Sequence, residues 1–268
     1  MKKIAITASK SKTQYFVNQA YIKYVADAGF IPIVVAPESM ATSTKICDGL
    51  LLPGGIDLDP LYYDEDNIMS YSTDPEKDAF ERAILQEFVA LEKPVFGICR
   101  GMQLIIREFL LSIKEDKYNE WFTFYQNVNS HNQTGSLSID RHIPTHYVSA
   151  DMAGLYGKPS RIKRIPVNSM HHQCLALSDK GRAPEVLKKD LTVLAWTRRG
   201  FDKKDKEIVV EAFRINNWPS KVLAVQWHPE ELSDIELLRN FFSPKRKKND
   251  HKPDKAPLAS KIADVVGQ

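Results

Sequence analysis

The stretch Val95-Phe96-Gly97-Ile98-Cys99-Arg100-Gly101-Met102-Gln103 decides the fold of this chain. Its apolar beginning predicts a short buried strand, and residues 102–111 have the pattern of a helix. Cys99 stands between the two, with a glycine two positions before it and another two positions after it. This is the layout of a nucleophile elbow, a sharp strand-to-helix turn with a reactive side chain at its tip. The glycines leave room for close backbone packing around a strained residue.

The elbow predicts a reactive thiol. Cys99 would lie at the N-terminus of the following helix, where the helix dipole and the free N–H groups favour negative charge on the sulfur. The backbone N–H of Arg100 would point toward a developing oxyanion. A cysteine in this position still needs a base, because the general triad requires a nucleophile, a base and a group that orients the base.

A candidate base lies near the other end of the chain. Residues 223–227 read as a strand, and His228-Pro229-Glu230 follows directly. Positions two apart in an extended segment face the same way. Glu230 can therefore accept a hydrogen bond from one imidazole nitrogen of His228 and leave the other for Cys99. We interpret Cys99, His228 and Glu230 as a catalytic triad.

A glycine turn supplies the remaining element of such a site. Residues 49–57 read as a strand that ends in Pro53-Gly54-Gly55. A turn of this kind can present backbone N–H groups to an anion. We therefore predict that the N–H groups of Gly55 and Arg100 form an oxyanion hole.

The pattern of apolar runs predicts an α/β fold. Continuous apolar strands that alternate with helices are typical of a mostly parallel, doubly wound sheet with helices on both faces. The tip of the elbow would then lie at the carboxyl edge of the sheet, where such folds place their sites. Strands are expected at 4–7, 31–35, 48–52, 95–98, 146–149, 164–167, 192–196, 208–215 and 222–227, and helices at 15–28, 74–91, 102–111 and 233–242.

The chain resembles the class I glutamine amidotransferase-like superfamily and, within it, the γ-glutamyl-γ-aminobutyrate hydrolase-like branch. The segments that carry the resemblance occur in the family's order and are residues 52–63, 74–81, 97–104, 167–173 and 225–230. The resemblance implies a flavodoxin-like glutamine amidotransferase fold over residues 1–243. It weakens over 112–145, where the Gly-Gly turn that the family has after the elbow helix is missing.

The resemblance also implies roles for residues outside the triad. Asp57 would stabilise the oxyanion turn, and Gln103 matches the superfamily position that contacts the glutamyl group. Pocket residues are expected at Asn168, Ser169, His171 and His172, with His172 favoured as a substrate contact. The alternative for these four is a structural hydrogen-bond cluster. His171, His172 and Cys174 fit no common zinc spacing, so no metal is expected.

Composition sets the remaining bounds. The chain has 268 residues, 43% of them hydrophobic, and a formal net charge of +3, which is too small to indicate nucleic-acid binding. Its three cysteines form no disulfide framework and suit a reducing cytoplasm. No signal peptide or membrane-spanning stretch is recognised. Residues 244–268 are basic and rich in proline, so we expect a mobile tail after a single domain of residues 1–243.

Two catalytic hypotheses share this site. The first is hydrolysis of a small-molecule γ-glutamyl amide through a glutamyl thioester on Cys99. The second is a glutaminase subunit that passes ammonia from glutamine to a separate synthetase partner. A non-catalytic, glutamine-binding role is a third hypothesis, which the complete triad disfavours. None of the three requires a cofactor.

Overall fold

The computed structural model describes residues 1–63, 65–113, 122–128, 140–177, 189–198 and 208–243. The predicted tail at 244–268 and most of the region 112–145 where the resemblance weakens lie outside the described residues. A polar, hairpin-like turn that the sequence predicts at 198–206 also lies outside them, except for Arg198. The described helices include none that is both long enough and apolar enough to span a membrane.

One half of the central sheet is parallel. Its strands are β1 (Lys3–Thr7), β4 (Ile31–Val35), β5 (Gly49–Leu52), β6 (Val95–Ile98) and β13 (Val222–Val225). They lie in the order β4-β1-β5-β6-β13. All neighbouring pairs in this order are parallel. The carboxyl ends of β1, β5, β6 and β13 therefore meet at one edge of the sheet.

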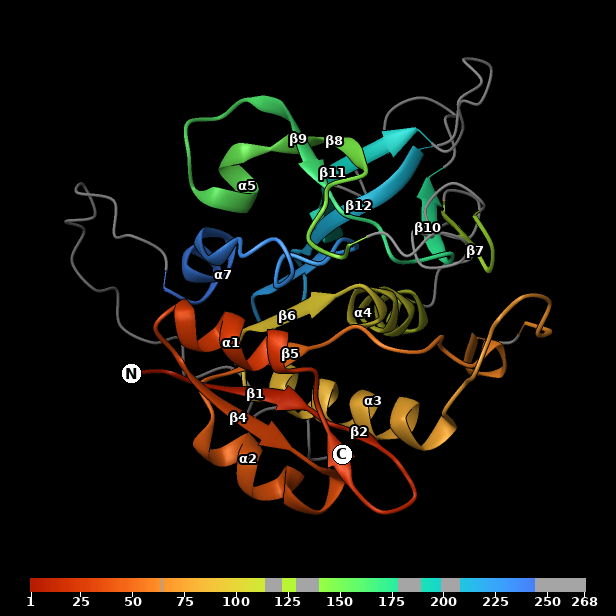
Figure 1. Ribbon diagram of the computed structural model, residues 1–268, viewed down its shortest axis with the longest axis vertical. Helices are drawn as coiled ribbons and strands as arrows, with labels where there is room; N and C mark the ends of the chain where they lie inside the picture. Colours follow the sequence, from red (N-terminus) through yellow and green to blue (C-terminus); the bar gives the residue numbers. More distant parts are fainter. Residues whose placement is uncertain (64, 114–121, 129–139, 178–188, 199–207, 244–268) are drawn as a thin grey trace, which may run out of the picture.

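The other half of the sheet is antiparallel. Its strands are β7 (Phe122–Tyr125), β8 (His146–Asp151), β9 (Ile162–Val167), β10 (Cys174–Leu177), β11 (Leu191–Arg198) and β12 (Ile208–Ile215). From β13 the order continues β12-β11-β8-β9, and β10 pairs with both β12 and β7. Figure 1 shows these strands extending the sheet away from the parallel half. Two further strands, β2 (Ser9–Lys10) and β3 (Tyr15–Phe16), form a separate hairpin.

Helices cover both faces of the parallel half (Figure 1). The helices are α1 (Gln19–Asp27), α2 (Met40–Ile46), α3 (Pro75–Ala90), α4 (Arg100–Ser112), α5 (Met152–Tyr156) and α7 (Ile235–Phe242), with single 3-10 turns η1 (Pro37–Ser39) and η2 (Pro60–Tyr63). Helices α1 and α7 contact each other on one face, and α2, α3 and α4 contact one another in sequence on the other. The predicted α/β, doubly wound fold is confirmed.

Strand residues alternate between two apolar cores, one on each face. Ala5 and Leu50 pack with the core under α2, α3 and α4, whereas Ile4, Ile6 and Leu51 pack with the core under α1 and α7. This is why the strands of the parallel half read as continuous apolar runs: each successive residue is buried on the opposite face.

Most predicted elements are present, with two kinds of difference. The helix predicted at 15–28 begins at Gln19, because the Asn18 side chain caps it by accepting the N–H of Ala20 at 2.9 Å. Tyr15 and Phe16 pair with β2 instead of joining the helix. Strands β7 and β10 and helices α2 and α5 were not predicted from the sequence, because they are short and have weak apolar periodicity.

The glycines of the elbow are required by close packing. A β-carbon on Gly101 would lie 2.3 Å from the carbonyl oxygen of Leu52, and one on Gly97 would lie 2.9 Å from the carbonyl oxygen of Gly101. Helix α4 thus sits directly on the end of β5, and the sequence-based role of these glycines is confirmed.

Gly101→Ala tests this packing. In an ordinary helix the change stabilises, but here the new methyl meets backbone, so we expect a loss of unfolding free energy of about 1–3 kcal/mol. Gly154→Ala in α5 is the control, because its nearest neighbour is the flexible side chain of Leu194 at 2.4 Å. Urea unfolding measures both variants. A Gly101→Ala protein at least as stable as the control would contradict the tight contact.

Candidate active site

Cys99 lies at the sharp turn between β6 and α4. Its φ of 51° is in the left-handed region, which few residues other than glycine adopt. The N–H of Cys99 donates to Val225 O of β13 at 2.8 Å, and its carbonyl accepts the N–H of Gln103 at 3.1 Å. The residue is therefore held from both sides, by a neighbouring strand and by the first turn of α4. The side chain is nearly buried and reaches a pocket.

His228 and Glu230 lie beside Cys99, after the end of β13. The Nδ1 atom of His228 donates to Oε1 of Glu230 at 2.6 Å. The second ring nitrogen, Nε2, takes no part in this bond. Cys99 lies close enough to the imidazole for its charge to raise the pKa of His228. Glu230 is shielded from solvent and does not line the pocket, whereas Cys99 and His228 both do. The structure thus brings together the three residues that the sequence analysis grouped as a triad, and their catalytic roles stay predictions.

The charges around His228 keep its ring protonated. Burial lowers the pKa of His228, but the opposing effects of Glu230 and Cys99 outweigh burial and raise the pKa to about 10. In neutral solution the ring is therefore an imidazolium that faces the sulfur. Such a group can stabilise a thiolate and later donate a proton to a leaving group.

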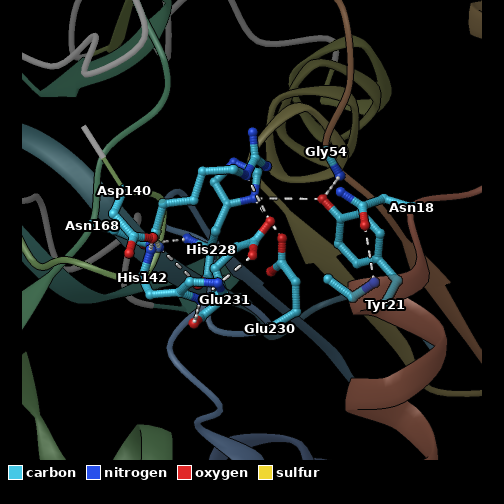
Figure 2. A network of polar contacts seen from close by, with 11 residues as sticks. Asn18, Tyr21, Gly54, Asp140, His142, Asn168, His228, Glu230 and Glu231 are labelled. Atoms are coloured by element: carbon cyan, nitrogen blue, oxygen red, sulfur yellow. Dashed lines mark hydrogen bonds and ion pairs between the residues drawn. The ribbon is translucent and has the colours of Figure 1, made fainter. Parts of the chain in front are cut away.

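Asn168 anchors the segment that carries His228. Its Oδ1 accepts the N–H of His228 at 2.9 Å, and its Nδ2 donates to the carbonyl oxygens of Arg141 and His228 at 2.9 and 3.2 Å. Figure 2 shows this contact on the opposite side of His228 from Tyr21. Asn168 thus acts on the backbone of His228 in this structure.

Tyr21 of α1 joins the glycine turn to the triad (Figure 2). Its hydroxyl accepts the N–H of Gly54 at 2.9 Å and lies 3.4 Å from Nδ1 of His228. Burial, together with the charges of Glu230 and Cys99, raises the pKa of Tyr21 well above its usual value, so the hydroxyl stays neutral. The sequence analysis gave Tyr21 no role beyond a place in the helix predicted at 15–28. The only signal in the sequence is that a residue with a hydroxyl lies on the otherwise apolar side of this helix.

The glycine turn packs against the triad. A β-carbon on Gly54 would lie 2.7 Å from Cε1 of His228 and 2.8 Å from the hydroxyl of Tyr21, so only glycine fits there. Gly55 follows and lines the pocket. Because the N–H of Gly54 is taken by Tyr21, the N–H of Gly55 is the donor of this turn that remains for a ligand.

The site opens into a pocket of about 480 Å³. Its walls come from the ends of β1 and β5, the hairpin β2–β3 with the segment that follows it, the start of α3, and loops before and after the antiparallel strands. The lining residues are Thr7, Ser9, Lys10, Phe16, Val17, Asn18, Tyr21, Pro53, Gly54, Gly55, Ile56, Asp74, Lys77, Cys99, Arg141, Met170 and His228.

The residues predicted to contact substrate lie around this pocket but not in its described wall. Gln103 is buried and donates from Nε2 to Gln173 O at 3.2 Å. His171 bonds through Nδ1 to the same carbonyl oxygen at 2.9 Å, and Ser169 is buried. From this segment, Met170 reaches the pocket, which the sequence analysis did not predict. Roles for these residues in substrate binding stay predictions.

His172 and Asp57 form a pair of their own. His172 Nε2 lies 2.8 Å from Oδ2 of Asp57, and the same oxygen accepts the N–H of Tyr71 at 2.7 Å. The ring of Tyr71 packs against His172 at 4.9 Å between centroids. Since Asp57 closely follows Gly55, this pair fastens the end of the glycine turn to the loop at 168–173.

Comparison with known proteins identifies the family. The sequence profile of the Peptidase C26 family matches residues 1–230. The chain belongs to this family. Proteins similar to it include one named as a glutamine amidotransferase-like protein, YvdE of Lactococcus lactis, which is 31% identical over 227 residues, with 80% of each chain covered.

A second relative is the γ-glutamyl-γ-aminobutyrate hydrolase PuuD of Escherichia coli. It is 26% identical, and the match covers 84% of this chain and 83% of that one. Among solved structures, the glutaminase domain of Trypanosoma brucei CTPS with bound acivicin has a TM-score of 0.54 at 16% identity, with 92% and 96% of the two chains covered. The resemblance to the class I glutamine amidotransferase-like superfamily is confirmed.

The raised pKa of His228 predicts a pH-dependent stability. A folded pKa near 10, above the usual 6.5, means that the protonated ring stabilises the fold fully below pH 6.5. This contribution is lost as the pH rises toward 10. We expect the unfolding free energy to fall more between pH 6.5 and 10 in the wild type than in His228→Asn.

Urea unfolding at both pH values measures the difference. Lys221, whose pKa is lowered to about 8 by burial, titrates in the same window but is present in both proteins, so its effect cancels. Equal losses in the two proteins would show that His228 is not held protonated.

Proposed function

We propose that this chain is a cysteine-dependent hydrolase of γ-glutamyl amides. The observation that carries the proposal is the grouping of Cys99 and His228 in the wall of a pocket beside a glycine turn, with Glu230 hydrogen-bonded to His228 from the buried side. Membership of Peptidase C26 and the likeness to a γ-glutamyl-γ-aminobutyrate hydrolase support the substrate class.

The reaction follows from the roles of these groups. The Cys99 sulfur attacks the γ-carbonyl carbon, and the carbonyl oxygen becomes an oxyanion that the N–H groups of Gly55 and Arg100 stabilise. The imidazolium of His228 gives its proton to the leaving amine, and a glutamyl thioester forms on Cys99. His228, now neutral, takes a proton from water, which attacks the thioester and releases glutamate.

In this proposal the amide that is cleaved binds in the pocket, and the side chains of the pocket wall surround it. Its cationic side chains already have acidic partners: Lys10 with Glu76 at 3.0 Å, Lys77 with Glu81 at 2.8 Å, and Arg141 with Glu231 at 2.7 Å. Apolar lining comes from Phe16, Val17, Ile56 and Met170.

The chain is proposed to act in a reducing cytoplasm. The buried cysteines Cys47, Cys99 and Cys174, none of which forms a disulfide, support this assignment.

Release of glutamate tests the proposal. Pure protein is incubated with glutamine and with a panel of γ-glutamyl amines, with and without cell extract. We expect release from γ-glutamyl amines by the pure protein alone. Release from glutamine only when extract is present would favour the alternative, a glutaminase subunit that supplies ammonia to a separate synthetase.

The nucleophile is tested by replacement and by labelling. Cys99→Ala should lower turnover on the order of a thousandfold or more, because loss of the thiol removes the covalent route. A glutamine-like chloroketone should add to one residue, Cys99, by peptide mass analysis. Cys47→Ala is the control and should keep the wild-type rate. Labelling at Cys47 or Cys174 would overturn the assignment.

The base and its orienter should differ in their effects. His228→Asn should cost about as much activity as loss of the thiol, since the two groups act as one unit. Glu230→Gln should cost less, because it keeps a hydrogen-bond acceptor for Nδ1 while removing the charge. Steady-state rates on a γ-glutamyl anilide measure both. A His228→Asn protein with near-normal turnover would exclude the triad.

A further inference from the structure

A cluster of buried charges lies beneath the glycine turn, in a sequence segment whose role the reaction does not explain. Residues 74–81 begin helix α3, where Asp74 caps the helix by accepting the N–H of Lys77 at 3.1 Å. Three residues of this segment, Lys77, Asp78 and Glu81, are 5%, 2% and 0% exposed. The fourth charged member of the cluster is Arg100 of the elbow, which is 1% exposed.

The guanidinium of Arg100 binds two carboxylates at once. One of its terminal nitrogens pairs with Glu81 and the other with Asp78. Glu81 Oε1 also accepts from Lys77 Nζ at 2.8 Å and from Thr7 Oγ1 at 2.6 Å. Two positive and two negative side chains are thus joined in one neutral group, which ties the end of β1 to α3 and α4.

The cluster reaches both halves of the proposed oxyanion hole. Arg100 supplies one N–H itself, at the first residue of α4. Beneath the other half, the position of a β-carbon on Gly55 is 3.4 Å from Cδ of Arg100 and 3.7 Å from Cε of Lys77. The aliphatic parts of both side chains therefore form the floor under the Gly55 turn. Asp78 also accepts the N–H of Asp59 at 3.0 Å, which fixes the chain just beyond that turn.

Stability alone does not account for this cluster. Buried ion pairs seldom stabilise a fold more than apolar residues of the same volume, because each charge must leave water. Glu81 remains ionised in spite of that cost: burial raises its pKa, but Arg100 and Lys77 outweigh burial and lower the pKa below the usual value. What such a cluster provides is geometry, since charge-assisted bonds at fixed angles hold the guanidinium in one orientation.

We propose that Asp78 and Glu81 are positioning residues, which act through Arg100 to hold the N–H groups of Arg100 and Gly55 at the separation that an oxyanion requires. This inference rests on the proposed hydrolysis at Cys99. It gives the acidic segment at 74–81 a part in stabilising the transition state, without contact between that segment's carboxylates and the reacting atoms.

Glu81→Gln is the variant that tests the inference. It keeps the size of the side chain but removes the charge that orients Arg100. We expect kcat on a γ-glutamyl anilide to fall by about tenfold to a hundredfold with little change in KM, since loss of a whole oxyanion-hole donor costs about a hundredfold to a thousandfold. Glutarate semialdehyde is an aldehyde analogue of the γ-glutamyl group without the α-amino group that would cyclise, and it forms a tetrahedral adduct with a thiol. Its affinity should fall by a similar factor.

Alkylation of Cys99 by iodoacetamide distinguishes a loss of oxyanion stabilisation from a general disturbance of the active site. Alkylation needs the thiolate and His228 but no oxyanion hole, so its rate in Glu81→Gln should stay within about twofold of the wild type.

Glu108→Gln is the matched control. Glu108 is 7% exposed and also bridges α4 to α3, accepting from Gln86 at 2.8 Å, but it lies at the far end of α4 from Cys99.

Each outcome decides for or against the inference. Equal kinetic effects of Glu81→Gln and Glu108→Gln, or a fall in alkylation as large as the fall in kcat, would overturn it. If Glu81→Gln does not fold by circular dichroism, Asp78→Asn replaces it, with the same expected signs. If the wild type hydrolyses no γ-glutamyl amide, the proposed function fails. The aldehyde affinity needs no turnover and still decides the inference.

Discussion

The backbone of Cys99 is the constraint on which the rest of this structure depends. A residue with a φ of 51° between a strand and a helix is strained by about 1–3 kcal/mol, and it persists only where its surroundings hold it. Here two contacts hold it: the N–H of Cys99 donates to β13, and helix α4 packs closely against the end of β5. Strand β13 also brings His228 to the same place, so one set of contacts both holds the backbone of Cys99 and places His228 near it.

The site solves a second physical problem, the burial of polar groups. His228, Glu230 and the hydroxyl of Tyr21 are all removed from water, and each would be costly alone. Their contacts offset part of this cost: Glu230 accepts from His228, and the hydroxyl of Tyr21 accepts the N–H of Gly54. The second carboxylate oxygen of Glu230 has no hydrogen-bond partner among the described residues, and Gly55, the next residue of the turn, lines the pocket.

The two halves of the sheet contribute differently to function. The parallel half brings the ends of β1, β5, β6 and β13 to one edge, which is where Thr7, Gly55, Cys99 and His228 gather. From the loops around the antiparallel half, Arg141 and Met170 reach the pocket wall and Asn168 anchors His228. The edge of the parallel half therefore holds the residues of the candidate site, and loops around the antiparallel half complete the pocket wall.

Local sequence determined the features that depend on neighbours in the chain. The strand, cysteine and helix of the elbow were predictable because Gly97 and Gly101 mark a close approach of backbones. The contact of His228 with Glu230 was also predicted, but the extended backbone assumed for it was wrong: the strand predicted at 222–227 ends at Val225, and Glu230 lies in a turn. The start of α3 was predictable from Asp74 and Pro75.

Only the tertiary structure decided which distant side chains meet. Tyr21 lies 33 residues from Gly54 and 207 from His228, and no periodicity within helix α1 indicates that its hydroxyl faces them. The contacts of Arg100 with Asp78 and Glu81 likewise depend on how α3 packs against α4. Hydrogen bonds and ion pairs act over a few ångströms in space. Spacing along the chain therefore reveals them only where the partners share one strand, helix or turn.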